Sequence, residues 1–266
     1  MVDMDGQTGS MLRLALLHLA PRVADLAHNR QLIETAVTTA AGLGAEWILT
    51  PELCVCGYQF SDRIGTDWIQ PPPDPWMRHL GRIVADLRVT VFLSHPERDP
   101  ATDKLYNTVF VSRDDGTWTA AHRKINVLGG AEAWSSPGET ALPIAVPPLS
   151  VGVLICADAY TPGIAQHLQA QGAQILVSSA AWPPRPHGPD GAWERRSRET
   201  GLPVFVCNRT GVDGRLDFVE AKSVVVSGGE RLLSFEAPDS TVIVVDWDVR
   251  DQTIIRRSTY PVASVD

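Results

Sequence analysis

Long apolar runs, basic clusters and paired cysteines are scarce in this sequence, and each scarcity excludes a class of protein. No segment approaches the roughly 18 consecutive apolar residues that a membrane-spanning helix needs. The formal net charge of -8 and the lack of a Lys/Arg run make nucleic acid and anionic membranes poor partners. The chain has neither a Gly-rich phosphate motif nor a Gly-x-Ser-x-Gly turn. The enzyme classes that these two motifs mark are therefore not indicated.

Cysteine is also sparse, with 4 residues in a chain of 266. A chain of this length buries enough apolar surface without disulfides, and scattered cysteines fit a reducing compartment. We therefore expect a cytoplasmic protein. Cys54 and Cys56 stand two apart with no histidine nearby, which is not a zinc spacing. We therefore expect no metal there.

The composition is that of a folded globular chain, with 44% hydrophobic and 20% charged residues. We see no internal repeat, linker or shift in composition, which favours a single domain over residues 11–266. Residues 1–10 are polar and predict a loose N-terminal segment. Residues 11–20 are apolar but short and follow acidic residues. They predict a first strand rather than a signal peptide.

Strand and helix patterns alternate along the chain and predict an α/β fold. A strand over residues 12–19 precedes a helix that we expect to have Asn29 as its N-cap and to end near Gly42. A second strand over residues 46–50 completes a β-α-β unit. The other expected strands are 90–94, 107–112, 117–123, 151–156, 174–179, 203–208, 223–227, 231–235 and 241–246, and the other helices start near Pro75, Pro162 and Trp193.

The segment over residues 151–160 carries the first indication of chemistry. An apolar run leads to Cys156 and then breaks into small and polar residues, which predicts a buried strand that ends at the cysteine. Open α/β sheets place ligand sites at this edge, where backbone N–H groups can face a developing oxyanion. The alternative is that Cys156 is a small core residue, as a cysteine in an apolar strand usually is.

Two other stretches supply groups that a reactive thiol needs. Glu52 follows the strand over 46–50 and would share a sheet edge with Cys156 if the two strands are parallel. Lys124 lies in a basic cluster after the strand over 117–123, and Glu132 follows eight residues later. Taken singly, Glu52 is more often a helix cap or a solvated loop residue, and the basic cluster is more often a surface feature.

Together these residue types form a coherent set. Thiol attack on an amide needs a base for the thiol proton, donors or a cation for the oxyanion, and an acid for the leaving amine. Glu52 can be the base and then the acid. Lys124 can stabilise the oxyanion and favour the thiolate, and Glu132 can hold Lys124 and the substrate nitrogen. Two carboxylates and a lysine in one dry pocket must also shift each other's pKa values.

The order of the motifs resembles that of the nitrilase superfamily, the carbon–nitrogen hydrolases with a Glu-Lys-Cys triad, and is closest to its amidase and carbamylase branches. The resemblance runs from about Leu12 to Asp246 and depends on several blocks in the family's order. The blocks are Asn29 with Gly44-Ala45-Glu46, Pro51-Glu52-Leu53 with Gly57-Tyr58, Leu105-Tyr106-Asn107-Thr108, Arg123-Lys124, Glu132 with Pro137-Gly138, 152–158, Gly172-Ala173, 178–182 and 207–211.

This resemblance implies a four-layer α-β-β-α sandwich and a homodimer or larger homo-oligomer packed through helices. It implies a hydrolase that cleaves a non-peptide carbon–nitrogen bond of a small amide and needs no cofactor. Cys156 would form a thioester, and Glu52 would move the protons. Lys124 and the backbone N–H of Ala157 would stabilise the oxyanion.

Departures from the family pattern narrow the expected substrate. Nitrilases typically carry Trp-Glu after the cysteine, whereas this chain has Ala157-Asp158, which favours amides over nitriles. Several branches place an arginine three or four residues after the cysteine to hold a substrate carboxylate, but Ala159 and Tyr160 stand there. We therefore expect poor turnover of N-carbamoyl amino acids and of dicarboxylic acid monoamides.

Two further departures concern the surroundings of the site. His122 stands where a tyrosine is common before Arg-Lys, and we interpret it as a surface substitution. The family's Phe-x-Gly-x-Ser block is matched loosely by residues 218–223, which lack the glycine. The conformation of that block, and with it the mouth of the pocket, stays open.

Aromatic side chains are candidates for the wall of the acyl pocket. Trp134 and Trp182, with Tyr58 and Tyr160, would give a preference for apolar or aromatic acyl groups. A core or interface role is equally open for the tryptophans, and the proline-rich loop 183–192 could be a lid or a fixed wall. The competing functions are a nitrilase, an N-carbamoyl amidohydrolase, an acyl transferase, a catalytically silent interaction module and an unrelated α/β binding protein.

Overall fold

The computed structural model describes residues 11–113, 115–184 and 189–264. The loose segment expected over residues 1–10 lies outside the described residues, as does the centre of the loop 183–192.

The first sheet brings strands from both ends of the sequence together. Its seven described strands have the order β15-β14-β1-β2-β3-β4-β5. Strands β1, β2 and β3 run parallel, and the outer strands pair antiparallel. The bounds are β1 Met11–His18, β2 Trp47–Leu49, β3 Thr90–Arg98, β4 Leu105–Ser112, β5 Trp118–Arg123, β14 Thr241–Asp248 and β15 Thr253–Pro261.

The second sheet comes from the middle of the chain. Its six described strands have the order β13-β12-β9-β8-β7-β6, with β7, β8 and β9 parallel. The bounds are β6 Ile144–Val146, β7 Leu149–Ile155, β8 Ile175–Ala180, β9 Val204–Asn208, β12 Ser223–Ser227 and β13 Glu230–Phe235.

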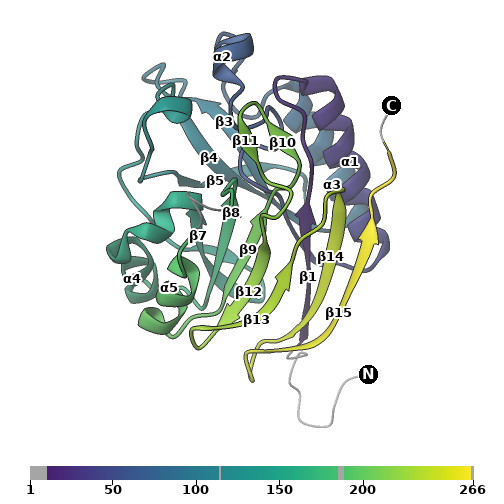
Figure 1. The fold of residues 1–266 in the computed structure, drawn as a ribbon, viewed down its shortest axis with the longest axis vertical. Helices are drawn as coiled ribbons and strands as arrows, with labels where there is room; N and C mark the ends of the chain where they lie inside the picture. Colours follow the sequence, from purple (N-terminus) through teal and green to yellow (C-terminus); the bar gives the residue numbers. More distant parts are fainter. Residues whose placement is uncertain (1–10, 114, 185–188, 265–266) are drawn as a thin grey trace.

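The helices provide the crossovers that parallel strands require, and they form the two outer layers (Figure 1). Helices α1 (Leu26–Gly42) and α3 (Pro75–Leu87) cover the first sheet, and α4 (Pro162–Ala170) and α5 (Ala192–Thr200) cover the second. The inner faces of the two sheets contact each other through β1 and β9 and through β5 and β7. The expected four-layer α-β-β-α sandwich is confirmed. Short elements complete the described chain: α2 Ser61–Ile64, η1 Gly130–Glu132, η2 Cys156–Tyr160, β10 Val212–Asp213 and β11 Leu216–Asp217.

The core lies between the sheets, because the central strands are covered on both faces. Apolar side chains fill consecutive positions of β1, β7, β8 and β9, as is typical of parallel strands between two layers. Phe205 of β9 and Trp247 of β14 meet across the layers, with ring centroids 5.0 Å apart. Each sheet therefore supplies half of one continuous apolar interior.

Most of the expected elements are confirmed, including the helix that starts at Pro75 and the hairpins β4–β5 and β12–β13. The expected N-cap of the first helix is wrong. The helix begins at Leu26, and the Asp25 side chain accepts the N–H of His28. Asn29 is buried and its amide instead donates to the carbonyl oxygens of Arg22 and Val55, so it fastens the helix to the loop after β2. The C-terminal strand β15 was not predicted.

Candidate active site

The nucleophile candidate, Cys156, lies directly after β7 in a tight turn. Its φ of +47° is in the left-handed region that non-glycine residues rarely adopt. The turn is held by Asp158, whose Oδ2 accepts the backbone N–H of Ile155 at 3.0 Å. Cys156 is only 4% exposed. On the other side of the cysteine, the Ala157 carbonyl accepts the side-chain amide of Asn126 at 2.7 Å. Contacts on both sides therefore hold Cys156 in this strained conformation.

Glu52 approaches the thiol from the other sheet. It follows β2 in the first sheet, whereas Cys156 follows β7 in the second, so the expectation of one shared sheet edge is wrong. The carboxylate is fully buried, and its Oε1 accepts the side-chain amide of Asn107 at 2.8 Å. Its Oε2 accepts the backbone N–H of Ala181 at 3.0 Å. The two sheets therefore face each other across the site.

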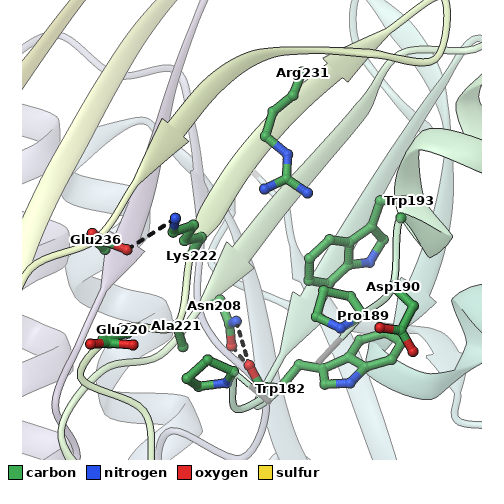
Figure 2. A pocket seen from close by; sticks show the side chains of 12 residues that line it. Trp182, Pro189, Asp190, Trp193, Asn208, Glu220, Ala221, Lys222, Arg231 and Glu236 are labelled. Atoms are coloured by element: carbon green, nitrogen blue, oxygen red, sulfur yellow. Dashed lines mark hydrogen bonds and ion pairs between the residues drawn. The ribbon is translucent and has the colours of Figure 1, made fainter. Parts of the chain in front are cut away.

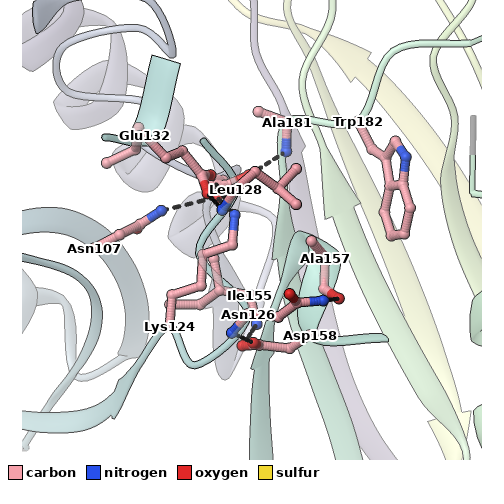
Figure 3. Close-up of polar contacts among 12 residues, drawn as sticks. Asn107, Lys124, Asn126, Leu128, Glu132, Ile155, Ala157, Asp158, Ala181 and Trp182 are labelled. Atoms are coloured by element: carbon pink, nitrogen blue, oxygen red, sulfur yellow. Dashed lines mark hydrogen bonds and ion pairs between the residues drawn. The ribbon is translucent and has the colours of Figure 1, made fainter. Parts of the chain in front are cut away.

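Lys124 follows β5 and is fully buried, with Glu52 and Glu132 as its partners. Figure 3 shows its side chain next to that of Glu132. Its Nζ donates to Glu52 Oε1 at 2.7 Å and to Glu132 Oε1. Glu132 is also fully buried, and its Oε2 accepts the backbone N–H of Leu128 at 2.8 Å. The structure thus brings together all four residues that the sequence motifs singled out: Glu52, Lys124, Glu132 and Cys156.

Burial and charge shift the protonation of these groups. Burial raises the pKa of Glu52 to about 7, although the charge of Lys124 opposes the rise. Burial and the Glu52 charge raise the pKa of the Cys156 thiol, and Lys124 only partly offsets them. Burial alone would lower the pKa of Lys124, but the charges of Glu52, Cys156 and Glu132 raise it. The resting site therefore holds a protonated thiol, a carboxyl group that titrates near neutral pH and a charged lysine.

A cavity of about 340 Å³ opens onto the thiol and has a mainly apolar wall. Four of the five proposed substrate-binding residues line it: Tyr58, Ala157, Tyr160 and Trp182. Trp134 is not among the lining residues, and its ring packs against Phe60 with centroids 5.0 Å apart. The remaining lining residues are Leu128, Cys156, Ala181, Pro183 and Leu216.

A second cavity, of about 570 Å³, shares the Trp182 wall (Figure 2). Trp182 packs edge-on against Tyr160 at 4.6 Å and against Trp193 at 5.2 Å between centroids. The backbone N–H and carbonyl of Trp182 are both paired with the side-chain amide of Asn208. This amide fixes the segment that also supplies the Ala181 N–H to Glu52.

Sequence reasoning missed the positioning groups of the site. Asn107 and Asn208 appeared only as parts of motif blocks, although a polar amide in an otherwise apolar strand is a usable signal. His122, expected at the surface, is buried, and its Nε2 lies 2.8 Å from Asp158 Oδ2. The expectation of a surface substitution is therefore wrong. In the block over residues 218–223, whose conformation the sequence left open, Phe218, Ala221 and Ser223 are buried and the residues between them are exposed. The Phe218 ring centroid lies 4.7 Å from the Arg209 guanidinium carbon.

Two features are absent from the described part of the chain. Within residues 11–113, 115–184 and 189–264, no group of three or more His, Cys, Asp or Glu side chains could hold a metal ion. No helix in that part is long and apolar enough to cross a membrane.

The comparison with protein families identifies the chain. The model of the carbon–nitrogen hydrolase family matches residues 13–252. Because this match covers most of the 266 residues, the chain belongs to the carbon–nitrogen hydrolase family. The expected membership of the nitrilase superfamily is thereby confirmed.

Two relatives illustrate the range of names within the family. A probable nitrilase of Schizosaccharomyces pombe is 24% identical over 255 residues, which cover 93% of this chain and 92% of the relative. N-carbamoylputrescine amidase of Arabidopsis thaliana is 24% identical over 250 residues, which cover 85% of this chain and 83% of the relative. Both span nearly the full length of the chain.

Solved structures of an amidase from Nesterenkonia sp. AN1 share the fold. One variant has a TM-score of 0.79 at 24% identity and covers 92% of this chain and 95% of its own. Another, at 26% identity with a TM-score of 0.78, covers 91% of this chain and 92% of its own. In that second structure the acetamide moiety of fluoroacetamide is added covalently at the active-site cysteine.

Proposed function

We propose that this protein is an amidase that hydrolyses a small amide through a thioester on Cys156. One observation carries the proposal: Glu52, Lys124 and Glu132 are all fully buried and hydrogen-bonded beside a cavity that Cys156 lines. Burying three ionisable groups costs free energy unless they pair with and hydrogen-bond to one another. Perturbed pKa values in such a cavity are typical of a catalytic site.

The acylation step uses the thiol and the Glu52 carboxylate. Glu52 takes the proton of the Cys156 thiol as the sulfur attacks the carbonyl carbon, and a carbon–sulfur bond forms. Lys124 has three N–H groups; two of them reach the glutamates, which leaves one for the negative oxygen of the tetrahedral intermediate. The backbone N–H of Ala157 is the second proposed donor.

Collapse of the intermediate breaks the carbon–nitrogen bond. Glu52 returns its proton to the leaving nitrogen, so ammonia or an amine departs and the acyl group stays on sulfur. Glu52 then takes a proton from water, the hydroxide attacks the thioester, and the carbon–sulfur bond breaks. The carboxylic acid leaves, and Glu52 returns the proton to the Cys156 thiolate. A carboxyl group with a pKa of about 7 can both accept and donate at neutral pH.

Glu132 and Tyr58 have supporting roles in this proposal. Burial and the charges of Glu52 and Glu132 raise the pKa of the Tyr58 phenol, so the phenol stays protonated and can donate a hydrogen bond. Glu132 holds the lysine and, through its contact with Leu128 N–H, also positions the loop that lines the cavity. Both residues therefore shape the site from positions beside the reacting groups.

The cavity supports a small acyl group of apolar or aromatic character. Its wall of Trp182, Tyr58 and Tyr160 suits such groups. The positions three and four after Cys156 are occupied by a buried Ala159 and by Tyr160, so no arginine clamp for a carboxylate arises there. The proposed preference for amides over nitriles rests on the sequence, because Ala157-Asp158 follows the cysteine where nitrilases typically carry Trp-Glu.

A substrate panel tests the proposed substrate class. Ammonia release is measured for aliphatic amides, aromatic amides, N-carbamoyl compounds and nitriles. The proposal predicts the highest kcat/KM for amides with apolar acyl groups. The variant Trp182→Ala should lose that acyl preference, and an unchanged profile would remove Trp182 from the acyl pocket. Nitrile turnover without turnover of free amides would instead favour a nitrilase.

Two further outcomes separate the remaining alternatives. Strong turnover of N-carbamoyl amino acids would contradict the inference drawn from the lack of an arginine three or four residues after Cys156. Faster hydroxamate formation than acid formation in hydroxylamine would favour an acyl transferase. The expected homodimer and the expected cytoplasmic location stay predictions, and light scattering of the purified protein would measure the first.

A further inference from the structure

Asp158 is the hub of a buried network that joins the lysine loop to the cysteine turn. The side chain of Asp158 is fully buried. Its Oδ1 accepts the backbone N–H groups of Ile125 at 3.1 Å and Asn126 at 2.8 Å, the two residues after Lys124. Its Oδ2 accepts the N–H of Ile155, the residue before Cys156, at 3.0 Å. One carboxylate therefore spans both segments.

His122 supplies the fourth contact of this carboxylate. Its Nε2 lies 2.8 Å from Asp158 Oδ2, and the imidazole side chain is 1% exposed. Burial alone would raise the pKa of Asp158, but hydrogen bonds from His122 and from backbone N–H groups hold this pKa below its ordinary value. The carboxylate is therefore ionised and can only accept. It follows that His122 Nε2 carries a hydrogen and donates it.

The place of His122 in the fold gives the contact its importance. His122 lies in β5 of the first sheet, two residues before Lys124, and Asp158 lies after β7 of the second sheet, two residues after Cys156. The other ring nitrogen, Nδ1, is buried without a hydrogen-bond partner in the described part of the chain. The ring therefore has one polar contact, and that contact crosses between the sheets at the reaction centre.

We propose that His122 is a positioning residue that fixes the distance and angle between the Lys124 ammonium and the Cys156 thiol. It acts through Asp158, which it holds in the rotamer that reaches both segments. Asn126 also connects the loop after Lys124 to the turn at Cys156, because its side-chain amide donates to the carbonyl of Ala157 at 2.7 Å. This inference rests on the proposed function. It adds a residue outside the Glu-Lys-Cys set that neither touches the substrate nor lines the cavity.

The physical reason is the strained turn at the nucleophile. Cys156 keeps a φ of +47° only while its surroundings over-determine that conformation. Without His122 the carboxylate retains three backbone donors but loses the side-chain contact that sets its rotamer. A shift of about 1 Å in a reacting group costs on the order of 100-fold in rate. The ground-state cavity, in contrast, is lined by other residues and should bind substrate as before.

The experiment compares two variants of His122 with one control. His122→Phe keeps the ring volume and removes the donor. His122→Gln keeps an N–H donor at about the position of Nε2. The control is His95→Phe, since His95 is also buried and lies 3.6 Å from an aspartate, Asp74, but has no contact with the Asp158 network. Each protein is measured for kcat and KM on the best amide of the panel and for melting temperature.

A second readout does not depend on the substrate. Iodoacetamide alkylates the Cys156 thiol, and peptide mapping by mass spectrometry gives its rate at that position alone. For His122→Phe we expect kcat to fall by about 10- to 100-fold with KM within about twofold, and the alkylation rate to fall with kcat. His122→Gln should recover most of both rates. His95→Phe should lower the melting temperature and leave both rates near wild type.

Three results would overturn the proposal. The first is a wild-type kcat in folded His122→Phe. The second is a His122→Gln variant as slow as His122→Phe, and the third is a loss that appears in KM rather than kcat. If His122→Phe does not fold, His122→Asn takes its place, because the shorter amide of asparagine cannot reach Asp158. His122→Asn should then have a low kcat, and His122→Gln a kcat near that of wild type. If wild type hydrolyses no amide, the proposed function fails, while the alkylation rates still decide whether His122 positions Cys156.

Discussion

Replacing Glu52 by glutamine should change the pH dependence of stability in a calculable way. The carboxyl has a pKa of about 7 in the folded protein, raised by burial from an ordinary value of 4.5. Because the folded-state pKa is raised, the stabilising contribution of the protonated group is complete below about pH 4.5 and is lost as the pH rises through about 7. Glutamine resembles the protonated form and does not titrate.

The magnitude follows from the shift. A rise from 4.5 to about 7 at about 1.4 kcal/mol per pKa unit gives about 3 kcal/mol. The group is fully buried, so solvent does not screen this contribution. The difference in the free energy of unfolding, Glu52→Gln minus wild type, should therefore increase by about 3 kcal/mol between about pH 4 and about pH 8. A pH-independent change in the free energy of unfolding caused by the glutamine itself does not affect this increase, because it is the same at both pH values.

Urea unfolding followed by tryptophan fluorescence at several pH values measures the difference. Glu230→Gln controls for the loss of one negative charge, since Glu230 is exposed at the start of β13. A difference between Glu52→Gln and wild type that stays flat with pH would refute the reasoning. So would one that moves in the opposite direction. Hydrolysis by Glu52→Gln should be abolished at every pH, because the proton acceptor is gone.

Other substitutions probe the groups around Glu52 and behind the cavity. Asn107→Ala removes a donor to ionised Glu52, so the pKa of Glu52 should rise and the acid limb of the pH–rate profile should move up by about one unit; an unmoved limb would contradict the contact. Arg209→Met strips the buried Asp213 of its ion-pair partner and should cost about 3–5 kcal/mol of unfolding free energy in urea titrations, whereas a loss below about 1 kcal/mol would show that the pair is dispensable. Gly138→Ala would place a Cβ against the last backbone carbonyl of β5; we expect lower kcat from a displaced lysine loop, and wild-type kinetics would count against that packing.

The sequence motifs located the reactive residues because each motif is local. Cys156, Glu52 and Lys124 each stand at or just after the end of a predicted strand. The end of a strand can be recognised from the apolar pattern and from the Pro, Gly and polar residues that interrupt it. Membership of a sheet is not readable in this way. β2 and β7 both read as buried strands that could share a sheet. Their placement in two facing sheets depends on pairing between distant segments, of β2 with β1 and β3 and of β7 with β8.

The positioning contacts could not be predicted for a related reason. His122 lies in β5, whose residues are mostly half-buried, so the local pattern gives a polar residue there no reason to be buried. Its buried partner, Asp158, lies in the turn after β7 of the other sheet. Asn29 shows the same effect at a helix: its residue type suits an N-cap, but contacts with Arg22 and Val55 take it inward. Tertiary partners decided both cases over local preference.

The central claim is that the Cys156 thiol carries out the hydrolysis, and ammonia release from the preferred amide by Cys156→Ala tests it most directly. Cys207→Ala is the matched control, because Cys207 is likewise a buried free thiol but lies in β9 within the core. The account predicts ammonia release by wild type and by Cys207→Ala, and none by folded Cys156→Ala. Equal release by Cys156→Ala and wild type would contradict it.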